Sequence, residues 1–129
     1  MKLWIGGAAI ALAHGVIAAD APPAIGSIEP AALVQQLDRN ANGCLDLEEG
    51  RNYTSRRFHA LDANGDNVLD AAEAPPLPGE PSAARPIGIE AWQDAYTARF
   101  NGFDADGSGC LSAEEITQGR AAAATGGAR

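Results

Sequence analysis

The sequence predicts an all-α fold made of repeated helix–loop–helix units, and three observations carry this prediction. Three twelve-residue stretches share one acidic pattern along the 129 residues. Apolar residues lie one and four positions before each stretch, which places them on one face of a helix that runs into it. Position 9 of each stretch is Asp or Ser and position 12 is Glu, the spacing of a capping box that begins a helix. Helix, loop and helix therefore occur three times.

The three stretches are loop one (38–49, DRNANGCLDLEE), loop two (62–73, DANGDNVLDAAE) and loop four (104–115, DADGSGCLSAEE). Oxygen-bearing side chains stand at positions 1, 3 and 5 of each loop, and a Glu stands at position 12. Calcium accepts six to eight oxygens, which such a loop supplies from alternating side chains, the backbone carbonyl of position 7 and a bidentate Glu. The pattern therefore predicts about three Ca²⁺ ions.

The predicted ligands follow from the loop positions. In loop one they are Asp38, Asn40, Asn42, the carbonyl of Cys44 and Glu49; in loop two Asp62, Asn64, Asp66, the carbonyl of Val68 and Glu73; in loop four Asp104, Asp106, Ser108, the carbonyl of Cys110 and Glu115. Position 6 requires a positive φ, which Gly43 and Gly109 adopt freely. Loop two has Asn67 there, the next best residue, so we expect a modestly weaker site. Loop four combines three carboxylates with glycine and is predicted to bind most tightly.

The N-terminal segment 1–19 has the pattern of a secretory signal peptide. Lys2 precedes an apolar run, and small residues before Asp20 offer a cleavage site. An uncleaved anchor is the alternative, although two glycines and His14 make a poor membrane span. Cleavage predicts a periplasmic or secreted protein without membrane contact, which begins with an N-terminal spacer at residues 20–30.

The charge and the remaining motifs exclude several classes of protein. The chain carries 17 Asp and Glu against 9 Lys and Arg, a formal net charge of −8, which argues against a nucleic-acid partner. His59, beside Arg56 and Arg57, is interpreted as a solvated helix residue rather than a general base. The sequence has no nucleophile motif or phosphate-binding glycine loop, so we expect no enzymatic activity.

The two cysteines both occupy position 7 of a loop. Cys44 lies in loop one and Cys110 in loop four. In an oxidising compartment they either form a disulfide between these loops or remain unpaired or intermolecular thiols. Their spacing does not suit zinc, because the sequence contains no CxxC and no neighbouring His.

With these loops and flanking helices, residues 31–119 resemble the EF-hand superfamily, and in particular the small exported EF-hand proteins of bacteria. The resemblance implies a calcium-binding, all-helical fold in which loops pair through a short two-stranded ribbon at position 8. Because EF-hands occur in pairs, it also implies two lobes. The first lobe covers residues 31–74 and contains loops one and two.

The second lobe needs a further unit, and residues 80–91 (EPSAARPIGIEA) stand 24 positions before loop four, the offset that separates loops one and two. Ile87 falls at position 8, but Ala91 replaces the required Glu, so this degenerate loop is expected to bind no metal. The alternative is a plain linker before a single unit. Trp92, Tyr96, Phe100 and Phe103 form an apolar helical stripe after it.

Prolines between the units predict the remaining boundaries. Residues 75–86 hold five prolines, which exclude an entering helix and indicate a semi-extended linker. The second lobe then covers residues 87–120, and residues 121–129 are predicted to form a flexible tail that extends the last helix by at most a turn or two.

The sequence therefore predicts an exported, non-enzymatic calcium-binding protein that acts as a calcium-stabilised structural or binding module or as a buffer. One alternative is a calcium-dependent regulator or docking partner of another exported protein. Another is a lanthanide or trace-metal binder, although position 2 holds Arg39, Ala63 or Ala105 instead of the Pro typical of lanthanide-selective loops.

Overall fold

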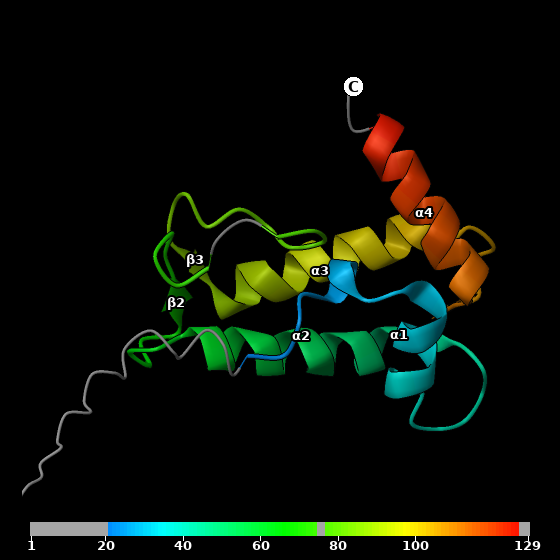
Figure 1. Ribbon diagram of the computed structural model, residues 1–129, viewed down its shortest axis with the longest axis horizontal. Coiled ribbons are helices and arrows are strands. Elements are labelled where there is room, and N and C mark those ends of the chain that lie inside the picture. The colour runs from blue at the N-terminus through cyan, green and yellow to red at the C-terminus, as the bar shows by residue number, and fades with distance from the viewer. Residues whose placement is uncertain (1–20, 75–76, 127–129) are drawn as a thin grey trace, which may run out of the picture.

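Two fifteen-residue helices, α2 (Leu47–Leu61) and α3 (Ile89–Phe103), lie side by side in the centre of the molecule (Figure 1). Two further helices, α1 (Pro30–Leu37) and α4 (Ala113–Gly126), pack together at one end of this central pair. The structure is a computed structural model and describes residues 21–74 and 77–126. The predicted signal peptide at residues 1–19 lies outside the described residues.

Four two-residue strands join the loops in two antiparallel ribbons. β1 (Leu45–Asp46) pairs with β4 (Cys110–Leu111), and β2 (Val68–Leu69) pairs with β3 (Ile87–Gly88). Position 8 of one loop faces position 8 of its partner, because Leu45 is opposite Leu111 and Leu69 is opposite Ile87. The predicted ribbons are therefore confirmed, and Ile87 takes the ribbon position that the degenerate loop predicts.

The order of pairing differs from the predicted two lobes, which are not confirmed. Loop one pairs with loop four, and loop two pairs with the degenerate loop. The ranges 31–74 and 87–120 thus each contribute one strand to each ribbon. The reason is the spacing of the loops, because an offset of 24 residues leaves only one helix, α2, between loops one and two. At 1.5 Å per residue this helix holds the two loops about 22 Å apart, too far for their strands to pair.

The core consists of two clusters at opposite ends of the central helix pair. The larger one gathers α1, both central helices and α4, and includes Leu33, Tyr96, Phe100 and Ile116. The smaller one lies around the second ribbon and includes Phe58, Leu69 and Trp92. The predicted stripe on α3 faces inward as expected, with Phe103 half-buried at its end. The Trp92 indole Nε1 donates to the carbonyl of Thr54 at 3.0 Å and so joins α3 to α2.

The proline-rich segment contains no helix in its described part, as predicted, but it packs against α2 instead of spanning two lobes. Glu80 forms a bidentate ion pair with Arg57 of α2, with 3.0 Å between the Nη2 and Oε1 atoms. Both side chains are at most 5% exposed. Arg57 Nη1 also donates to the carbonyl of Pro22 at 2.6 Å, which ties the N-terminal segment to the same place.

Two predicted segment boundaries also change. Loop two ends in a turn at residues 71–73 where a helix was predicted to begin, because the prolines that follow cannot donate the next helical hydrogen bonds. The predicted N-terminal spacer contains the 3₁₀ helix η2 (Ile25–Ser27) and α1 begins at its last residue; Ile25 is part of the larger core cluster. Helix α4 continues to Gly126, which matches the predicted extension of the last helix by a turn or two. Within the described residues, no helix combines the length and apolar character that a membrane crossing requires.

Candidate metal centres

Each acidic loop lies where one element ends and the next begins. Loop one follows α1 and leads into α2 through a full capping box, in which the Asp46 side chain accepts from the Glu49 N–H at 2.8 Å and Glu49 accepts from the Asp46 N–H at 3.0 Å. Ser112 and Glu115 form the same reciprocal pair before α4, with both distances 3.1 Å. Position 12 is therefore held by the start of a helix in loops one and four, as the sequence predicts.

The carboxylate at position 1 folds each loop back on itself. Asp38 accepts from the N–H of Gly43 at 2.7 Å, and Asp104 accepts from the N–H of Gly109 at 2.8 Å. In loop two Asp62 accepts from the N–H of Asn67, also at 2.8 Å. The position 6 donor has a positive φ, which is +83° at Gly43 and +62° at Asn67. In loops one and four the second oxygen of this carboxylate also accepts a backbone N–H, from Asn42 and Ser108 respectively, at 3.1 Å.

The glutamate at position 12 reaches back across the loop in all three cases. Its second oxygen accepts from a backbone N–H near the loop start: Arg39 to Glu49 at 2.7 Å, Ala63 to Glu73 at 3.1 Å and Asp106 to Glu115 at 3.2 Å. The carboxylate therefore lies next to the first ligand positions. This is the arrangement that a bidentate calcium ligand needs.

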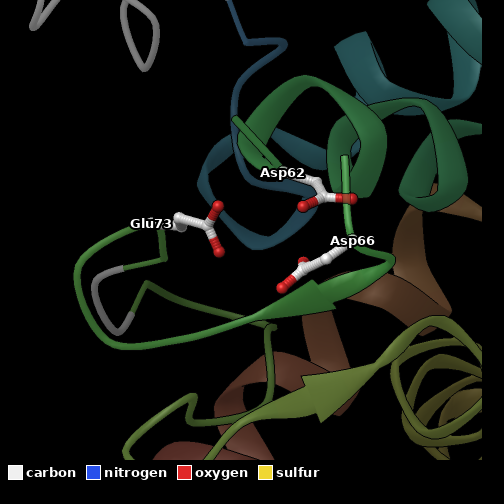
Figure 2. Close-up of side chains that lie close together, drawn as sticks. All are labelled: Asp62, Asp66 and Glu73. Atoms are coloured by element: carbon white, nitrogen blue, oxygen red, sulfur yellow. The ribbon is translucent and has the colours of Figure 1, made fainter. Parts of the chain in front are cut away.

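Loops two and four each bring three carboxylates together. In loop two they belong to Asp62, Asp66 and Glu73, and Figure 2 shows them facing a common space from three sides. In loop four they belong to Asp104, Asp106 and Glu115. Each residue offers one oxygen, and within each group these oxygens lie within 4.8 Å of one another. Such closely spaced negative charges repel each other unless a cation lies among them.

The buried carboxylate of Asp62 gives the sharpest test of whether a cation fits. Asp62 is 7% exposed, and its Oδ1 atom is buried without a hydrogen-bond partner among the described residues. An unpaired buried carboxylate oxygen costs far more free energy than an exposed one. A divalent cation among Asp62, Asp66 and Glu73 would neutralise it, so the donor set of hard oxygens fits Ca²⁺.

Loop one differs from the other two in its charge. Its predicted ligand positions hold two carboxylates, those of Asp38 and Glu49, with Asn40 and Asn42 at the remaining side-chain positions. The amide oxygens accept backbone hydrogen bonds within the loop, from Asn42 to Asn40 at 3.2 Å and from Cys44 to Asn42 at 3.3 Å. Loop one therefore has the same backbone path as loops two and four but less charge for a cation.

The remaining predicted ligands lie in the same loops. Asn64 accepts from the N–H of Asp66 at 3.3 Å, and the Ser108 hydroxyl donates to the carbonyl of Cys110 at 3.0 Å. Hydrogen bonds from the side chain and backbone of Ser108 lower the pKa of Asp106, which keeps that carboxyl ionised. Cys44, whose carbonyl is a predicted ligand of loop one, directly precedes β1, and Val68, its counterpart in loop two, is the first residue of β2.

A disulfide joins Cys44 of loop one to Cys110 of loop four. The two Cα atoms are 5.5 Å apart, beside the ribbon that pairs β1 with β4. Of the two alternatives that the sequence leaves open, the structure has the bridge. It became possible because loops one and four are neighbours in space, although the cysteines are 66 positions apart in sequence.

One further position of the loops has a special backbone conformation that the acidic pattern did not predict. Position 4 also has a positive φ, which is +70° at Gly65 and +65° at Gly107. Loop one has Ala41 there, at φ +60°. The glycines in the other two loops were the available signal, since a repeated Gly at one loop position indicates a left-handed backbone.

Comparison with protein families supports this geometry. The model of the EF hand family matches residues 56–73, which comprise the end of α2 and all of loop two. A search of curated proteins gives no match to the chain.

Proposed function

The chain belongs to the EF-hand superfamily, and we therefore propose that it is an exported, non-enzymatic protein whose loops one, two and four each bind one Ca²⁺ ion. Its residues at positions 1, 3, 5 and 12, with the position 7 carbonyl, supply the ligands in each loop. Bound calcium supplies positive charge that neutralises the carboxylates and ties the two ends of a loop together.

The observation that carries this proposal is the buried, unpartnered Oδ1 atom of Asp62 among the carboxylates of loop two. A surface cluster of acids would leave its oxygens in water, where each is solvated. Here the first ligand of the loop is withdrawn from water and faces two further carboxylates (Figure 2). The corresponding acidic group in loop four supports a second site of the same kind.

The disulfide supports the proposed export and favours a structural module over a calcium sensor. Disulfides persist in oxidising compartments such as the periplasm or the extracellular space. A covalent link between loops one and four also holds the ribbon together whether or not calcium is present, which restricts the opening on which a sensor depends. Fractionation of cells that express the full chain, followed by mass determination of its N-terminus, tests cleavage and export together.

Calorimetric calcium titration of residues 20–129 tests the metal sites. We expect three ions per chain, with the tightest step at loop four because it has three carboxylates and glycine at position 6. Glu49→Gln, Glu73→Gln and Glu115→Gln should each remove one step, since each loses a bidentate ligand.

The neighbouring acids at position 11 give matched controls for two of these variants. Glu48→Gln and Glu114→Gln remove the same charge from exposed side chains one residue away and should retain three steps. Four ions would contradict the assignment of residues 80–91 as a non-binding loop. No uptake at millimolar calcium would overturn the proposed function. Terbium has a higher charge than calcium and binds ordinary EF-hand loops more tightly for that reason. A preference for terbium larger than in those loops would instead favour the trace-metal alternative.

A further inference from the structure

An apolar cavity lies between α3, α4 and the N-terminal segment, and the ribbon residues Leu45 and Leu111 form part of its wall. Its volume is about 380 Å³, and its inner wall includes the buried side chains of Leu33, Phe100 and Ile116. Folded cores have few voids larger than one water molecule. A cavity of this volume instead lies at the lower end of the range for small-molecule sites.

Two arginines line the same cavity. The guanidinium of Arg99 lies 5.7 Å from the ring centroid of Phe103, and Arg120 Nη2 donates to the carbonyl of Ile25 at 3.1 Å. Within residues 21–74 and 77–126, neither arginine forms a salt bridge; the ion pair found there joins Arg57 to Glu80. The cavity therefore has an apolar wall and two cationic groups without a carboxylate in contact.

The two positive charges affect each other. Burial and the positive charge of Arg99 lower the pKa of Arg120, whereas the negative charge of Glu29 raises it. Nine cationic residues are present in a chain of net charge −8, so two of them at one cavity stand out from the acidic surface. Guanidinium groups bind carboxylates through paired, charge-assisted hydrogen bonds, which an anionic ligand head would satisfy.

We propose that this cavity binds a single-chain fatty carboxylate of medium length, with its head between Arg99 and Arg120 and its chain against Leu33, Phe100 and Ile116. The volume favours one chain over the two of a phospholipid. The site is distinct from the metal sites, because the loops contribute the apolar Leu45 and Leu111 to its wall and none of their charged ligands.

Calorimetric titration with decanoate tests the proposal on residues 20–129 with the disulfide intact. Calcium is kept low enough that light scattering shows no insoluble calcium decanoate. We expect one decanoate per chain, with methyl NMR shifts at Leu33 and Ile116. Decanol and decyltrimethylammonium share the chain but lack the negative head, so both should bind about tenfold or more weakly.

Variants separate the head site from the chain site. Arg99→Gln and Arg120→Gln should each weaken decanoate binding about tenfold, because each loses a charge-assisted hydrogen bond. Ala124→Trp, on the exposed part of the cavity wall, should block binding while leaving the buried core unchanged. Arg56→Gln is the matched control, since Arg56 lies over the Tyr53 ring at 5.5 Å, as Arg99 lies over Phe103, but away from the cavity.

Three results would overturn the proposal. The first is no decanoate binding by the folded wild-type chain. The second is equal binding of decyltrimethylammonium, which would leave the arginines without a role. The third is a dimer, measured by sedimentation, that Ala124→Trp dissociates, because a second copy of the chain would then occupy the cavity. If Arg120→Gln unfolds the chain through loss of its bond to Ile25, Arg99→Gln and Ala124→Trp still decide the outcome.

Discussion

At the scale of single residues, backbone conformation separates loop one from the other two. Positions 4 and 6 of every loop lie in the left-handed region. Glycine and asparagine adopt that region at small cost, but the Cβ of alanine meets the following carbonyl oxygen. Gly65 and Gly107 supply position 4 in loops two and four, whereas Ala41 holds it in loop one. Loop one is therefore both the least charged loop and the one with a strained backbone residue.

Replacement of this residue should stabilise the protein. We expect Ala41→Gly to raise the free energy of unfolding by about 1 kcal/mol, because the strain at φ +60° is relieved. Urea unfolding followed by circular dichroism measures the change, in calcium and in chelator.

The reverse substitution is the control. Gly107→Ala should lower stability by about the same 1 kcal/mol, since its φ is +65° and an added Cβ would meet nothing within 4 Å. Asn67→Gly should change stability less than either, because Asn tolerates this conformation. Equal effects at Ala41 and Asn67 would contradict the explanation by strain.

At the scale of elements, a close contact between α2 and α3 sets the centre of the fold. A Cβ placed on Gly50 would lie 1.7 Å from the hydroxyl of Tyr96, so the glycine allows the tyrosine to reach α2. That hydroxyl is buried without a partner in the described part of the chain. Burial raises the pKa of Tyr96 strongly, and the nearby carboxylates of Asp46 and Glu49 raise it further.

Substitution at this contact should separate the helices. We expect Gly50→Ala to lower the free energy of unfolding by about 1–3 kcal/mol through overpacking, despite the better helix propensity of alanine. The matched control is Gly102→Ala in α3, where an added Cβ meets nothing within 4 Å; it should stabilise by about 0.5–1 kcal/mol.

A second variant identifies the atom responsible. Tyr96→Phe combined with Gly50→Ala should recover part of the loss, because the clashing hydroxyl is then gone. Thermal unfolding of the wild type, the two single variants and the double variant measures the coupling between the two positions. Additive effects would show that Gly50 acts through something other than Tyr96.

At the scale of the whole molecule, the disulfide links the first and last binding loops and so closes most of the folded chain. A bridge across 66 positions restricts the unfolded chain, which the chain-entropy account values at about 4 kcal/mol. It also lies one residue before the ribbon residue Leu45 in loop one, and Cys110 itself belongs to β4. The bridge should therefore affect loops one and four more than loop two.

Removal of the bridge tests this difference. In Cys44→Ser/Cys110→Ser we expect the free energy of unfolding to fall by about 4 kcal/mol, and the calcium steps of loops one and four to weaken while that of loop two is unchanged. Guanidinium unfolding and calorimetric calcium titration measure the two effects. Wild-type protein in reductant should behave like the double variant; a uniform loss at all three loops would show that the bridge acts only through global stability.

Much of the site could be predicted from local patterns. The loop register predicts the capping boxes at Asp46 and Ser112 and the positive φ of Asn67, because each depends on hydrogen bonds between residues a few positions apart. The ribbon position of Ile87 pairs it with Leu69, 18 positions away, and was predicted from the 24-residue offset between loops. The same capping pattern wrongly predicted a helix at the end of loop two. The capping pair between Asp70 and Glu73 does form, but the prolines that follow prevent a helix from continuing.

The sequence by itself determined the acidic loops, the helices that flank them except after loop two, and the apolar face of α3, since these follow from periodicity and turn chemistry. Only the tertiary structure decided which loops are neighbours. The rigid length of α2 separates loops one and two, and its antiparallel packing with α3 brings loop one to loop four. That arrangement also decided the Cys44–Cys110 bridge and the burial of Asp62, because contacts between distant residues depend on how whole helices pack.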